Sequence, residues 1–538
     1  MVVAAHPAAA EAGRQILAQG GNAVDASVAV GFALAVAYPR AGNLGGGGFL
    51  VLRQPDGTAT TIDHRETAPA AATPDVYLDA QGNAVPNRSR TGPLASGVPG
   101  TVAGLLHALD AYGTLSRAEV MAPAIELAVA GFALLPTQAR ALNQAQDAFN
   151  QFSSTRRYFG ADSDQGGRYE PGQVLRQPDL ANVLIRIREH GRDGFYTGPT
   201  ANLIVSQMQR GGGLITHDDL AAYTAVEREP VVSTYRDHRV IAMGPPSSGG
   251  VALAQLLNAA AAHDVAARGL NASATIHTLG EAMRRVFADR ATWMGDPDFV
   301  EMPIEGLAAP AYMRQRMASV QSDRITPTDS VSHGTPPGAA SMETTHYSVV
   351  DANGQAVSVT TTINSSYGSK VVVDGAGFFL NNEMDDFSLK PGVPNQYGLV
   401  GSERNAVAPQ KRMLSSMTPT IVEDPEGRLD LVIGSPGGPT IITTVFQVIM
   451  NVIDHDMDIE QAITAPRFHH QWKPRSMWLE RHGFPQDVRQ NLEARGWPLD
   501  VRSRWGRAHG VHVRYRDDGT RTYHGSADPR REGVAIGL

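Results

Sequence analysis

Two adjacent threonines, Thr344 and Thr345, stand where a loose polar segment changes into a strand-like stretch. The segment 321–343 is rich in Pro, Gly, Ser and Thr, and the residues that follow, THYSVVDANGQAVSVTT, alternate as a hairpin does. The sequence has no cysteine, so a covalent nucleophile would have to be a hydroxyl, an amine or a carboxylate. A β-branched residue at a strand start is ordinary, so the pair alone assigns no function.

A threonine hydroxyl becomes an effective nucleophile when a base lies beside it. The α-amine of an N-terminal threonine, with a pKa of about 7.7–8.0, is such a base at neutral pH. Cleavage between Glu343 and Thr344 would make Thr344 an N-terminal residue and free that amine. Thr345 would then remain an ordinary strand residue. The chemistry available at this point of the chain is therefore self-cleavage followed by nucleophilic catalysis.

Several other kinds of site are excluded or disfavoured by the sequence. It contains no G-x-S-x-G turn, no H-E-x-x-H pair and no phosphate-binding P-loop. His469 and His470 are neighbours on an expected strand, so they point to opposite faces and cannot share one metal ion. Without cysteine there is no disulfide and no Cys-ligated zinc. The absence of cysteine does not indicate whether the protein works in an oxidising or a reducing compartment. A net charge of −8 with no long Lys/Arg run argues against a nucleic-acid partner.

Helices are expected to hold most of the first part of the chain. Residues 6–38 form two candidate helices divided by GGN, and the second is apolar over residues 26–38. That stretch is shorter than the roughly 20 residues of a membrane-spanning helix, so a buried helix is expected. Residues 100–325 are mostly helical in pattern, with a helix start at Thr216 capped by Asp219.

Short hairpins with Asp/Gly turns surround this helical part. The glycine run 45–48 leads into a strand and lacks the Lys-Ser/Thr of a phosphate loop, which favours a close approach of two backbones. One hairpin is expected near the start of the chain and three in its last third, at residues 49–63, 346–360, 419–434 and 512–525. Helices flanking antiparallel hairpins predict a layered arrangement.

Blocks along nearly the whole chain resemble the γ-glutamyltranspeptidases. Those before residue 344 include GGNAVDASVAVGFALAVAYPRAGNLGGGGF, IDHRETAP, LASGVPGTVAGL and GPPSSGG; those after it include TTHYSVVDANGQAVSVTTTINSSYGS, GFFLNNEMDDFSLKPGVPNQYGLVG, KRMLSSMTPTIV and GSPGG. The resemblance implies an N-terminal-nucleophile hydrolase of the α+β class, an αββα sandwich of two stacked antiparallel sheets between helical layers. It also implies one precursor that cuts itself into a large subunit, 1–343, and a small catalytic subunit, 344–538, which together form one domain. No metal or organic cofactor is implied.

The resemblance assigns roles to individual positions. Thr344 is matched to the cleavage site and nucleophile, and Thr362 to the threonine that orients it. Gly437 and Gly438 are matched to the glycines whose N–H groups stabilise an oxyanion, and glycine suits close approach to a developing charge. The residues after them, Pro439 and Thr440, differ from the Ser-Arg of many bacterial relatives. The resemblance therefore assigns the oxyanion hole but not the residues at its rim.

A γ-glutamyl group carries an α-carboxylate and an α-ammonium at its far end. The first calls for a cation and hydroxyl donors, and the second for carboxylates. By the resemblance, Arg65, Ser415 and Ser416 match the residues that bind the α-carboxylate. Asn364, Glu383 and Asp386 match those that bind the α-ammonium.

Residues 391–401 match a lid that some members of the family have, with Tyr397 at its tip. A lid excludes water and holds an acyl-enzyme for a chosen acceptor. The expected partners are therefore a γ-glutamyl substrate such as glutathione and amino-acid or peptide acceptors. No secretory signal begins the sequence; the resemblance implies a periplasmic or secreted protein whose signal has been removed.

Two other functions remain open on the sequence. A glutaryl-cephalosporin acylase could use the same scaffold, but its substrates lack the α-ammonium that Glu383 and Asp386 are expected to hold. An unprocessed protein could bind γ-glutamyl compounds without chemistry, although the nucleophile and the oxyanion glycines would then have no use.

Overall fold

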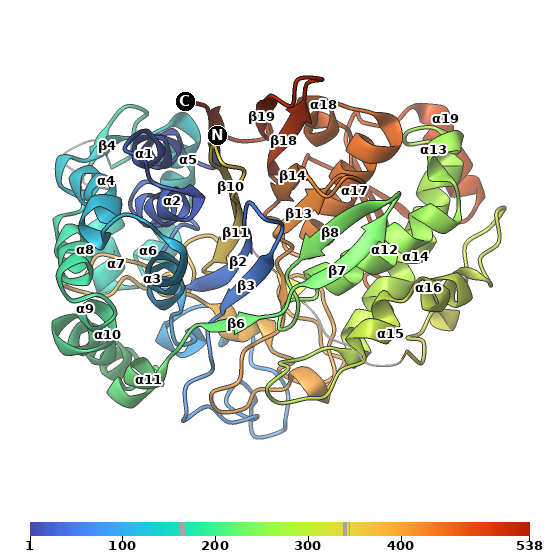
Figure 1. Ribbon diagram of the computed structural model, residues 1–538. Helices are drawn as coiled ribbons and strands as arrows, with labels where there is room; N and C mark the ends of the chain where they lie inside the picture. Colours follow the sequence, from blue (N-terminus) through green and yellow to red (C-terminus); the bar gives the residue numbers. More distant parts are fainter. Residues whose placement is uncertain (162–166, 337–341, 344) are drawn as a thin grey trace.

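Two large antiparallel sheets form the centre of the molecule (Figure 1). The computed structural model describes residues 1–161, 167–336, 342, 343 and 345–538. The first sheet has the order β20-β1-β10-β11-β2-β3-β6, with strands Val534–Ile536, Val2–Ala4, Thr345–Val350, Ala356–Thr362, Gly47–Arg53, Ala59–His64 and Val226–Arg228. The second has the order β19-β18-β14-β13-β8-β7, with strands Arg521–Ala527, His509–Tyr515, Leu429–Gly434, Thr420–Glu423, His238–Ala242 and Val231–Tyr235.

The sheets are stacked face to face and each carries a layer of helices on its outer side, as Figure 1 shows. Side chains from both sheets meet between them in one apolar cluster that includes Phe49, Ile241, Val350 and Val432. Separate clusters lie under the two helical layers. The predicted αββα sandwich is therefore confirmed, because each sheet buries one face against the other and one against helices.

The outer layer on the first sheet comes from the first part of the chain. Its helices are α1 Pro7–Ala18, α2 Ala23–Ala37, α3 Thr101–Tyr112, α4 Arg117–Ala130, α5 Pro136–Gln144, α6 Gln146–Phe149, α7 Ser153–Phe159, α8 Pro178–His190, α9 Asp193–Tyr196, α10 Gly198–Gly211 and α11 His217–Ala222. All fifteen residues of α2 are buried, which confirms the buried helix predicted for the apolar stretch. The capping box at Thr216 and Asp219 is confirmed as well.

The layer on the second sheet comes from the middle and the end of the chain. Its helices are α12 Gly249–Ala262, α13 Val265–Arg268, α14 Ser273–Trp293, α15 Ile304–Ala308, α16 Pro310–Met317, α17 Thr440–His455, α18 Ile459–Thr464 and α19 Gln486–Ala494. Three small sheets complete the fold: β9 Met342–Glu343 with β12 Ser415–Ser416, β4 Phe132–Ala133 with β5 Val174–Leu175, and β15 Phe468–His469 with β16 Met477–Glu480 and β17 Leu499–Arg502. Over the described residues, no helix is both long and apolar enough to cross a membrane.

All four predicted hairpins are present, as β2–β3, β10–β11, β13–β14 and β18–β19. Sequence analysis missed a fifth, β7–β8, inside the part expected to be helical. Its turn residues Arg236 and Asp237 have positive φ angles of 48° and 65° without a glycine, so the usual turn signal is lacking.

Residues from both sides of position 344 contribute strands to both sheets. In the first sheet β1 lies between β20 and β10, and β11 pairs with β2. In the second sheet β13 pairs with β8. A break at 344 would consequently leave the two pieces joined by backbone hydrogen bonds and a common core.

Asp25 in α2 ties the first two helices to the loop after α3. Its carboxylate is fully buried and accepts hydrogen bonds from the backbone N–H of Asn22 (2.9 Å), from the N–H and hydroxyl of Thr114 (2.9 and 2.6 Å), and from the N–H of Leu115 (3.2 Å). Thr114 is exposed and Asn22 and Leu115 are half-buried, while the carboxylate itself is fully buried. Asp25 thus links the start of α2 to the loop after α3 through these hydrogen bonds.

We expect Asp25→Ala to lower the free energy of unfolding by about 2 kcal/mol, because half-buried and exposed donors that converge on a fully buried carboxylate lose a charged acceptor. Urea unfolding followed by circular dichroism measures the loss. The matched control is Asp110→Ala, an exposed aspartate in the last turn of α3, which should change the free energy by less than about 0.5 kcal/mol. Equal losses in the two variants would contradict a role for these hydrogen bonds.

Candidate functional site

The chain changes its pairing partner at the predicted cleavage site. Before it, β9 (Met342–Glu343) lies parallel to β12 (Ser415–Ser416). After it, β10 pairs with β11, beginning at Thr345 opposite Thr361. Thr344 itself lies outside the described residues. The backbone on its two sides thus belongs to two different sheets.

Thr362 and Asn364 lie at the end of β11, where the strand leaves the first sheet. The Thr362 hydroxyl accepts a hydrogen bond from the backbone N–H of Asn364 (2.6 Å), and Asn364 has a φ of 66°. The opposite backbone comes so close that a Cβ on Gly46 would lie 1.9 Å from the Thr362 carbonyl oxygen. The glycine run 45–48 was predicted to let two backbones approach closely. This prediction is confirmed, because Gly46 lies against the backbone at the end of β11.

Gly437 and Gly438 form the turn that leads from β14 into α17. Their φ angles are 139° and 66°, in the region that favours glycine, and the Thr440 hydroxyl donates to the Gly437 carbonyl (2.6 Å). Within the described part of the chain, neither glycine N–H has a hydrogen-bond partner. Two free N–H groups at the start of a 16-residue helix suit a negatively charged oxygen.

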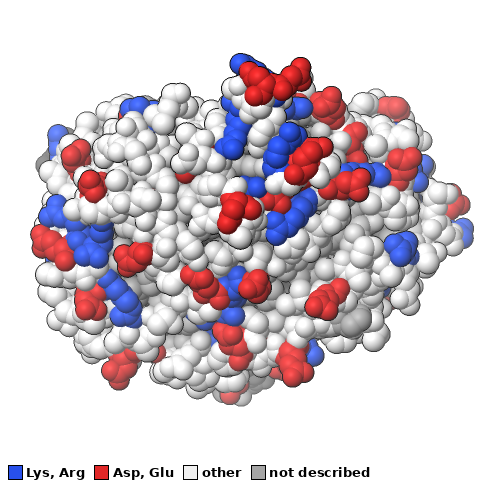
Figure 2. All heavy atoms as spheres, viewed as in Figure 1, with Lys and Arg blue, Asp and Glu red and all other residues white. Residues whose placement is uncertain are grey.

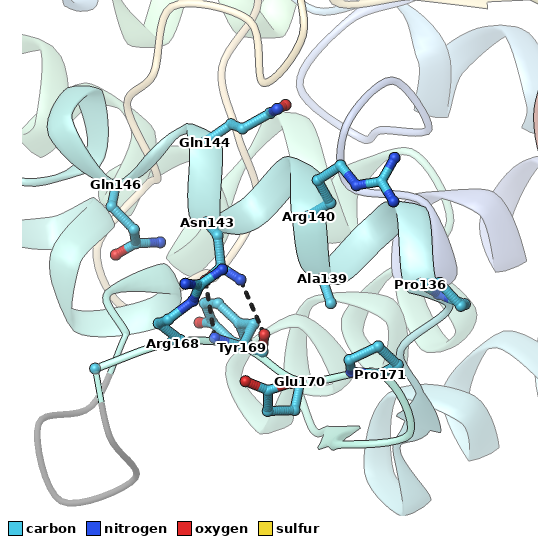
Figure 3. Close-up of a pocket in the computed structure, with 11 residues that line it drawn as sticks. Pro136, Ala139, Arg140, Asn143, Gln144, Gln146, Arg168, Tyr169, Glu170 and Pro171 are labelled. Carbon is cyan, nitrogen blue, oxygen red and sulfur yellow. Dashed lines mark hydrogen bonds between the residues drawn. The ribbon is translucent and has the colours of Figure 1, made fainter.

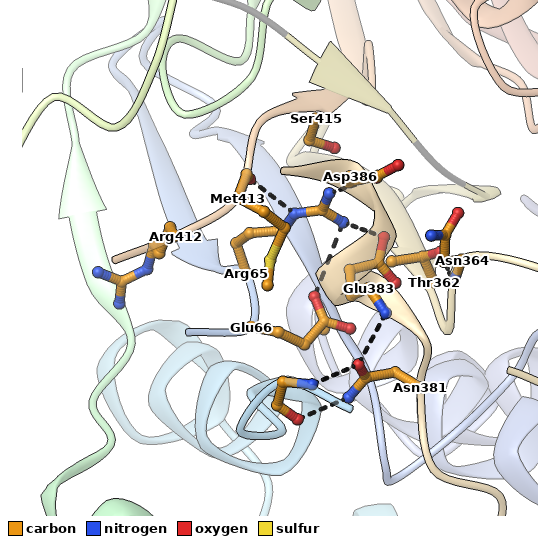
Figure 4. A network of polar contacts seen from close by, with 12 residues as sticks. Arg65, Glu66, Thr362, Asn364, Asn381, Glu383, Asp386, Arg412, Met413 and Ser415 are labelled. Carbon is orange, nitrogen blue, oxygen red and sulfur yellow. Dashed lines mark hydrogen bonds and ion pairs between the residues drawn. The ribbon is translucent and has the colours of Figure 1, made fainter. Parts of the chain in front are cut away.

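Arg65 is fully buried at the end of β3 and is surrounded by three carboxyl groups (Figure 4). Its guanidinium pairs with Glu383 and with Asp386 (2.8 Å), and Glu66 lies 3.7 Å away. The backbone carbonyls of Met413 and Leu414 accept its remaining hydrogen bonds at 3.2 and 3.3 Å. The structure thus joins the predicted carboxylate-binding arginine directly to the predicted ammonium-binding acids.

The cluster holds three carboxyl groups for one guanidinium, so its charge depends on how many of the carboxyl groups are protonated. Burial raises the pKa of Glu66 to about 7 and of Asp386 to about 6, and it raises the pKa of Glu383 well above its ordinary value, all against the attraction of Arg65. Both carboxyl oxygens of Glu66 and Oε2 of Glu383 lack a hydrogen-bond partner among the described residues. A buried acidic cluster with unsatisfied oxygens is suited to receive a cationic group.

Ser415 and Ser416, on β12, are fully buried beside the carbonyls that hold Arg65. The Ser416 hydroxyl lies 3.5 Å from the guanidinium of Arg290, a second cation that acts on Asp386. Because β12 pairs with β9, the chain just before position 344 runs along these serines. The serines are therefore near the predicted site.

A cavity of about 360 Å³ opens between the end of β11 and the glycine turn. Its lining is Arg40, Ala41, Thr362, Asn364, Ser365, Ser366, Gln396, Tyr397, Pro436, Gly437, Gly438 and Arg507. Five of the residues predicted from the sequence are in this lining. Arg65, Glu383, Asp386 and the two serines lie deeper, and Asn364 connects the two parts, since its Nδ2 donates to the Asn382 carbonyl (2.9 Å) at the start of the acidic turn.

The predicted lid, residues 391–401, lies over this connection. The Tyr397 hydroxyl donates to Asn364 Oδ1 (2.8 Å), and Asn395 Nδ2 donates to Asp386 Oδ1 (3.3 Å). From the other side, Gln471 Nε2 donates to the Tyr397 carbonyl (2.9 Å). These contacts hold the segment against Asn364, Asp386 and Gln471.

A larger hollow, about 590 Å³, lies elsewhere, between α5 and residues 167–171 (Figure 3). Asn143 and Tyr169 exchange two hydrogen bonds across it, at 2.8 and 2.9 Å. It adjoins residues 162–166, which are not described, and none of the predicted site residues lines it. The smaller cavity is the candidate site, because it contains the groups that could do chemistry.

Two other features bear on binding. His469 and His470 bond separately, to the Thr443 hydroxyl (2.8 Å) and the Arg475 carbonyl (3.1 Å), and no group of three potential metal ligands occurs among the described residues. On the face drawn in Figure 2, Lys and Arg are interspersed with Asp and Glu and form no continuous basic stripe.

Sequence analysis missed four residues that shape the site. Glu66 follows Arg65 directly, so its presence in the cluster was detectable. Asn381 begins the acidic turn and bonds to the backbone of Gly45, Gly97 and Glu383, at 2.8–3.0 Å. Arg40 and Arg507 gave no signal, because 466 positions separate them from each other in the sequence.

Comparison with known proteins finds one family model, Gamma-glutamyltranspeptidase, that matches residues 9–538. A glutathione hydrolase proenzyme of Escherichia coli (strain K12) is 45% identical over 531 residues, which is 98% of this chain and 90% of that protein. The crystal structure of Helicobacter pylori gamma-glutamyltranspeptidase is 45% identical, with a TM-score of 0.60, over 61% of this chain and 94% of that one. A cephalosporin acylase from Bacillus halodurans is 27% identical, with a TM-score of 0.87, over 99% and 94%.

The acidic cluster makes the stability of the protein depend on pH in a definite direction. Its carboxyl groups have raised pKa values, so the folded state binds more protons than the unfolded state between about pH 4.5 and 7. Their contribution to the free energy of unfolding therefore falls as pH rises through this range.

We expect Glu383→Gln to remove part of this dependence, so the variant's free energy of unfolding rises relative to wild type between pH 5 and pH 8. Urea unfolding at both pH values measures this difference, in which titrating groups distant from the cluster cancel and the altered pKa values of Glu66 and Asp386 are included. Glu403→Gln, at an exposed position, is the control and should give the same difference at both pH values. A difference for Glu383→Gln that does not change with pH, or falls, would count against the cluster.

Proposed function

The chain belongs to the gamma-glutamyltranspeptidase family, and from this we propose that it is a glutathione hydrolase that also transfers γ-glutamyl groups to amines. One observation carries the proposal. A single cavity holds two free glycine N–H groups and the end of β11, and it leads through Asn364 to a buried cluster of three acids and one arginine. An acyl-transfer site and a recognition site for a zwitterionic group are thus adjacent.

The first step we propose is self-cleavage. The Thr344 hydroxyl adds to the carbonyl carbon of Glu343, the amide becomes an ester, and water hydrolyses the ester to leave a carboxylate on Glu343 and an amine on Thr344. The products are a large subunit, 1–343, and a small subunit, 344–538. They remain one folded domain because their strands are interleaved in both sheets.

The second step is attack on the substrate. Thr344 Oγ adds to the γ-carbonyl carbon while the α-amine takes its proton, and the N–H groups of Gly437 and Gly438 stabilise the resulting oxyanion. The leaving amine takes a proton and departs, and the γ-glutamyl ester then passes to water or to an acceptor amine. Thr362 suits an orienting role, because its hydroxyl oxygen already accepts from Asn364 and its proton is free for the nucleophile.

Recognition of the γ-glutamyl group is an exchange of partners in the deep cluster. The α-ammonium pairs with Glu383 and Asp386 and reaches the Asn364 amide. The α-carboxylate takes the guanidinium of Arg65 and the hydroxyls of Ser415 and Ser416. Each new ion pair replaces one that exists in the empty protein, so little charge is left uncompensated at any stage.

Two alternatives are less well supported. A glutaryl substrate, as in the acylases, brings no cation to a cluster of three carboxyl groups and one guanidinium. A protein that only binds would not need two unpartnered N–H groups beside the cavity. Identity to a glutathione hydrolase (45%) also exceeds identity to the cephalosporin acylase (27%).

The family also suggests where the protein works. We propose a periplasmic or secreted enzyme, in which the closed lid over Asn364 holds the acyl-enzyme for amino-acid or peptide acceptors.

We expect Thr344→Ala to abolish both processing and activity, because it removes the nucleophile of both steps. Wild type should give bands of about 36 and 21 kDa, in proportion to 343 and 195 residues, and the variant one band of 57.3 kDa. N-terminal sequencing of the smaller piece should begin at Thr344. Thr345→Ala is the control and should be processed. A single full-length wild-type band without activity would end the enzyme proposal.

We expect wild type to prefer γ-glutamyl over glutaryl anilides, because only the former carries the ammonium. Asp386→Asn should lower kcat/KM for the γ-glutamyl compound about 100-fold and shrink the preference, since one charged partner of the ammonium is lost. Asp517→Asn, in the exposed β18–β19 turn, should change neither value. Wild-type preference for the glutaryl compound would instead support the acylase function.

A further inference from the structure

The three acids of the turn Glu383–Asp386 do not share one partner. Glu383 and Asp386 pair with Arg65, whereas no ion pair joins Asp385 to that guanidinium among the described residues. The Asp385 side chain is nevertheless fully buried. Because a buried charge without partners is costly, its carboxylate requires donors from elsewhere in the chain.

The partners of Asp385 come from two separate segments. On one side, the Ser89 hydroxyl (2.6 Å) and Arg90 Nε (3.1 Å) donate to Oδ1. On the other side, the backbone N–H of Gln396, in the predicted lid, donates to Oδ2 (3.0 Å). One carboxylate thus connects the lid to a loop that precedes position 344. We call Asp385, Ser89, Arg90 and the N–H of Gln396 the lid latch.

The lid has little apolar packing to hold it in place. Its residues 391–394 are exposed and 395–398 are half-buried, and within 391–401 only Leu399 is buried. Its side toward the loop 84–90 borders a hollow of about 210 Å³. Polar contacts at residues 395–397 therefore provide much of its attachment.

Only some of these polar contacts are compatible with a bound substrate. Asn364 and Asp386 accept hydrogen bonds from the lid, at 2.8 and 3.3 Å, and both are also proposed to bind the α-ammonium. Gln471 and Asp385 hold the lid without being proposed substrate ligands, and of these two only Asp385 carries a charge. A backbone N–H that donates to a carboxylate makes a charge-assisted hydrogen bond, which is stronger than a neutral one.

The lid latch holds the part of the lid that lines the catalytic cavity. Gln396 and Tyr397 both belong to the lining of the 360 Å³ cavity. Loss of the bond at the Gln396 N–H would therefore free this wall of the cavity while leaving the acids that face Arg65 in place.

We propose that Asp385 keeps the lid over the acyl-enzyme, and that Ser89 and Arg90 anchor it in the large subunit. This inference rests on the proposed function. Asp385 is a positioning residue, because it acts through Gln396 and not on the substrate. A lid held in place limits the access of water to the γ-glutamyl ester, so the lid latch favours transfer to an acceptor amine over hydrolysis.

The first measurement is the partition of the acyl-enzyme between water and an acceptor. With γ-glutamyl-p-nitroanilide as donor and glycylglycine as acceptor, processed enzyme forms γ-glutamyl-glycylglycine and glutamate, and their ratio is measured. The ratio does not depend on the fraction of enzyme that is active. In Asp385→Asn we expect it to fall about tenfold, because an amide cannot accept hydrogen bonds on both sides as the carboxylate does.

The second measurement is hydrogen exchange of the lid, which requires no activity. The backbone amides of residues 395–398 should exchange about tenfold faster in Asp385→Asn than in wild type, since the lid opens more often. Ser89→Ala/Arg90→Gln leaves every acid in place and removes the anchor in the large subunit. It should shift the partition ratio and the exchange rate in the same directions, by about threefold.

Asp374→Asn is the control. The ion pair of Asp374 with Arg157 (3.1 Å) also joins the two pieces of the chain but involves no residue of the lid. Both readouts should keep their wild-type values in this variant. If Asp385→Asn does not fold or process, Ser89→Ala/Arg90→Gln decides.

An unchanged partition ratio in Asp385→Asn would overturn the inference and leave the proposed function standing. So would a lower ratio with unchanged exchange of the lid, because the effect would then pass through Asp386. Wild-type values of both readouts in Ser89→Ala/Arg90→Gln would overturn the anchor in the large subunit. Absence of hydrolysis of every γ-glutamyl compound by processed wild type would overturn the proposed function, while hydrogen exchange would still test the lid latch.

Discussion

The ion cluster around Arg65 is the constraint on which the rest of the site depends. A guanidinium removed from water is tolerated only with partners in good geometry, and here they come from three separate parts of the chain: β3 and the residue after it, the turn at Glu383–Asp386, and the carbonyls before β12. The end of the first sheet, the acidic turn and the segment entering the second sheet must therefore be correctly placed together. The proposed recognition of a zwitterionic group would use the same contacts that join the two sheets.

Asparagine and glycine supply the precision around that cluster. Asn381 uses both ends of its amide to hold the acidic turn against Gly45 and Gly97, and the glycine run lets β2 and β11 come together where side chains would clash. Asn364, held at a positive φ, links the cavity, the acidic turn and the lid through three hydrogen bonds. A shift of any one of these backbones would move the Thr362 hydroxyl and the acids together.

The interleaving of strands also explains how a chain can be cut near its centre and stay folded. β1 is held between β20 and β10, and β13 pairs with β8, so separation of the pieces would expose both sheets. The proposed cleavage between Glu343 and Thr344 would leave these strand pairings in place.

Much of this was accessible from the sequence, because hairpins, caps and buried helices are set by local periodicity and turn chemistry. Such patterns predict β2–β3, β10–β11, α2 and the cap at Thr216. Long motifs predict the αββα class and carry the roles proposed for Thr344, Thr362, Gly437 and Gly438. The β7–β8 hairpin was missed because its turn lacks a glycine. The pairing of Arg65 with the acids, and the meeting of Arg40 with Arg507, follow no local pattern. They were decided only when sheet stacking brought distant segments into one low-dielectric space, where a charge requires a partner or a ligand.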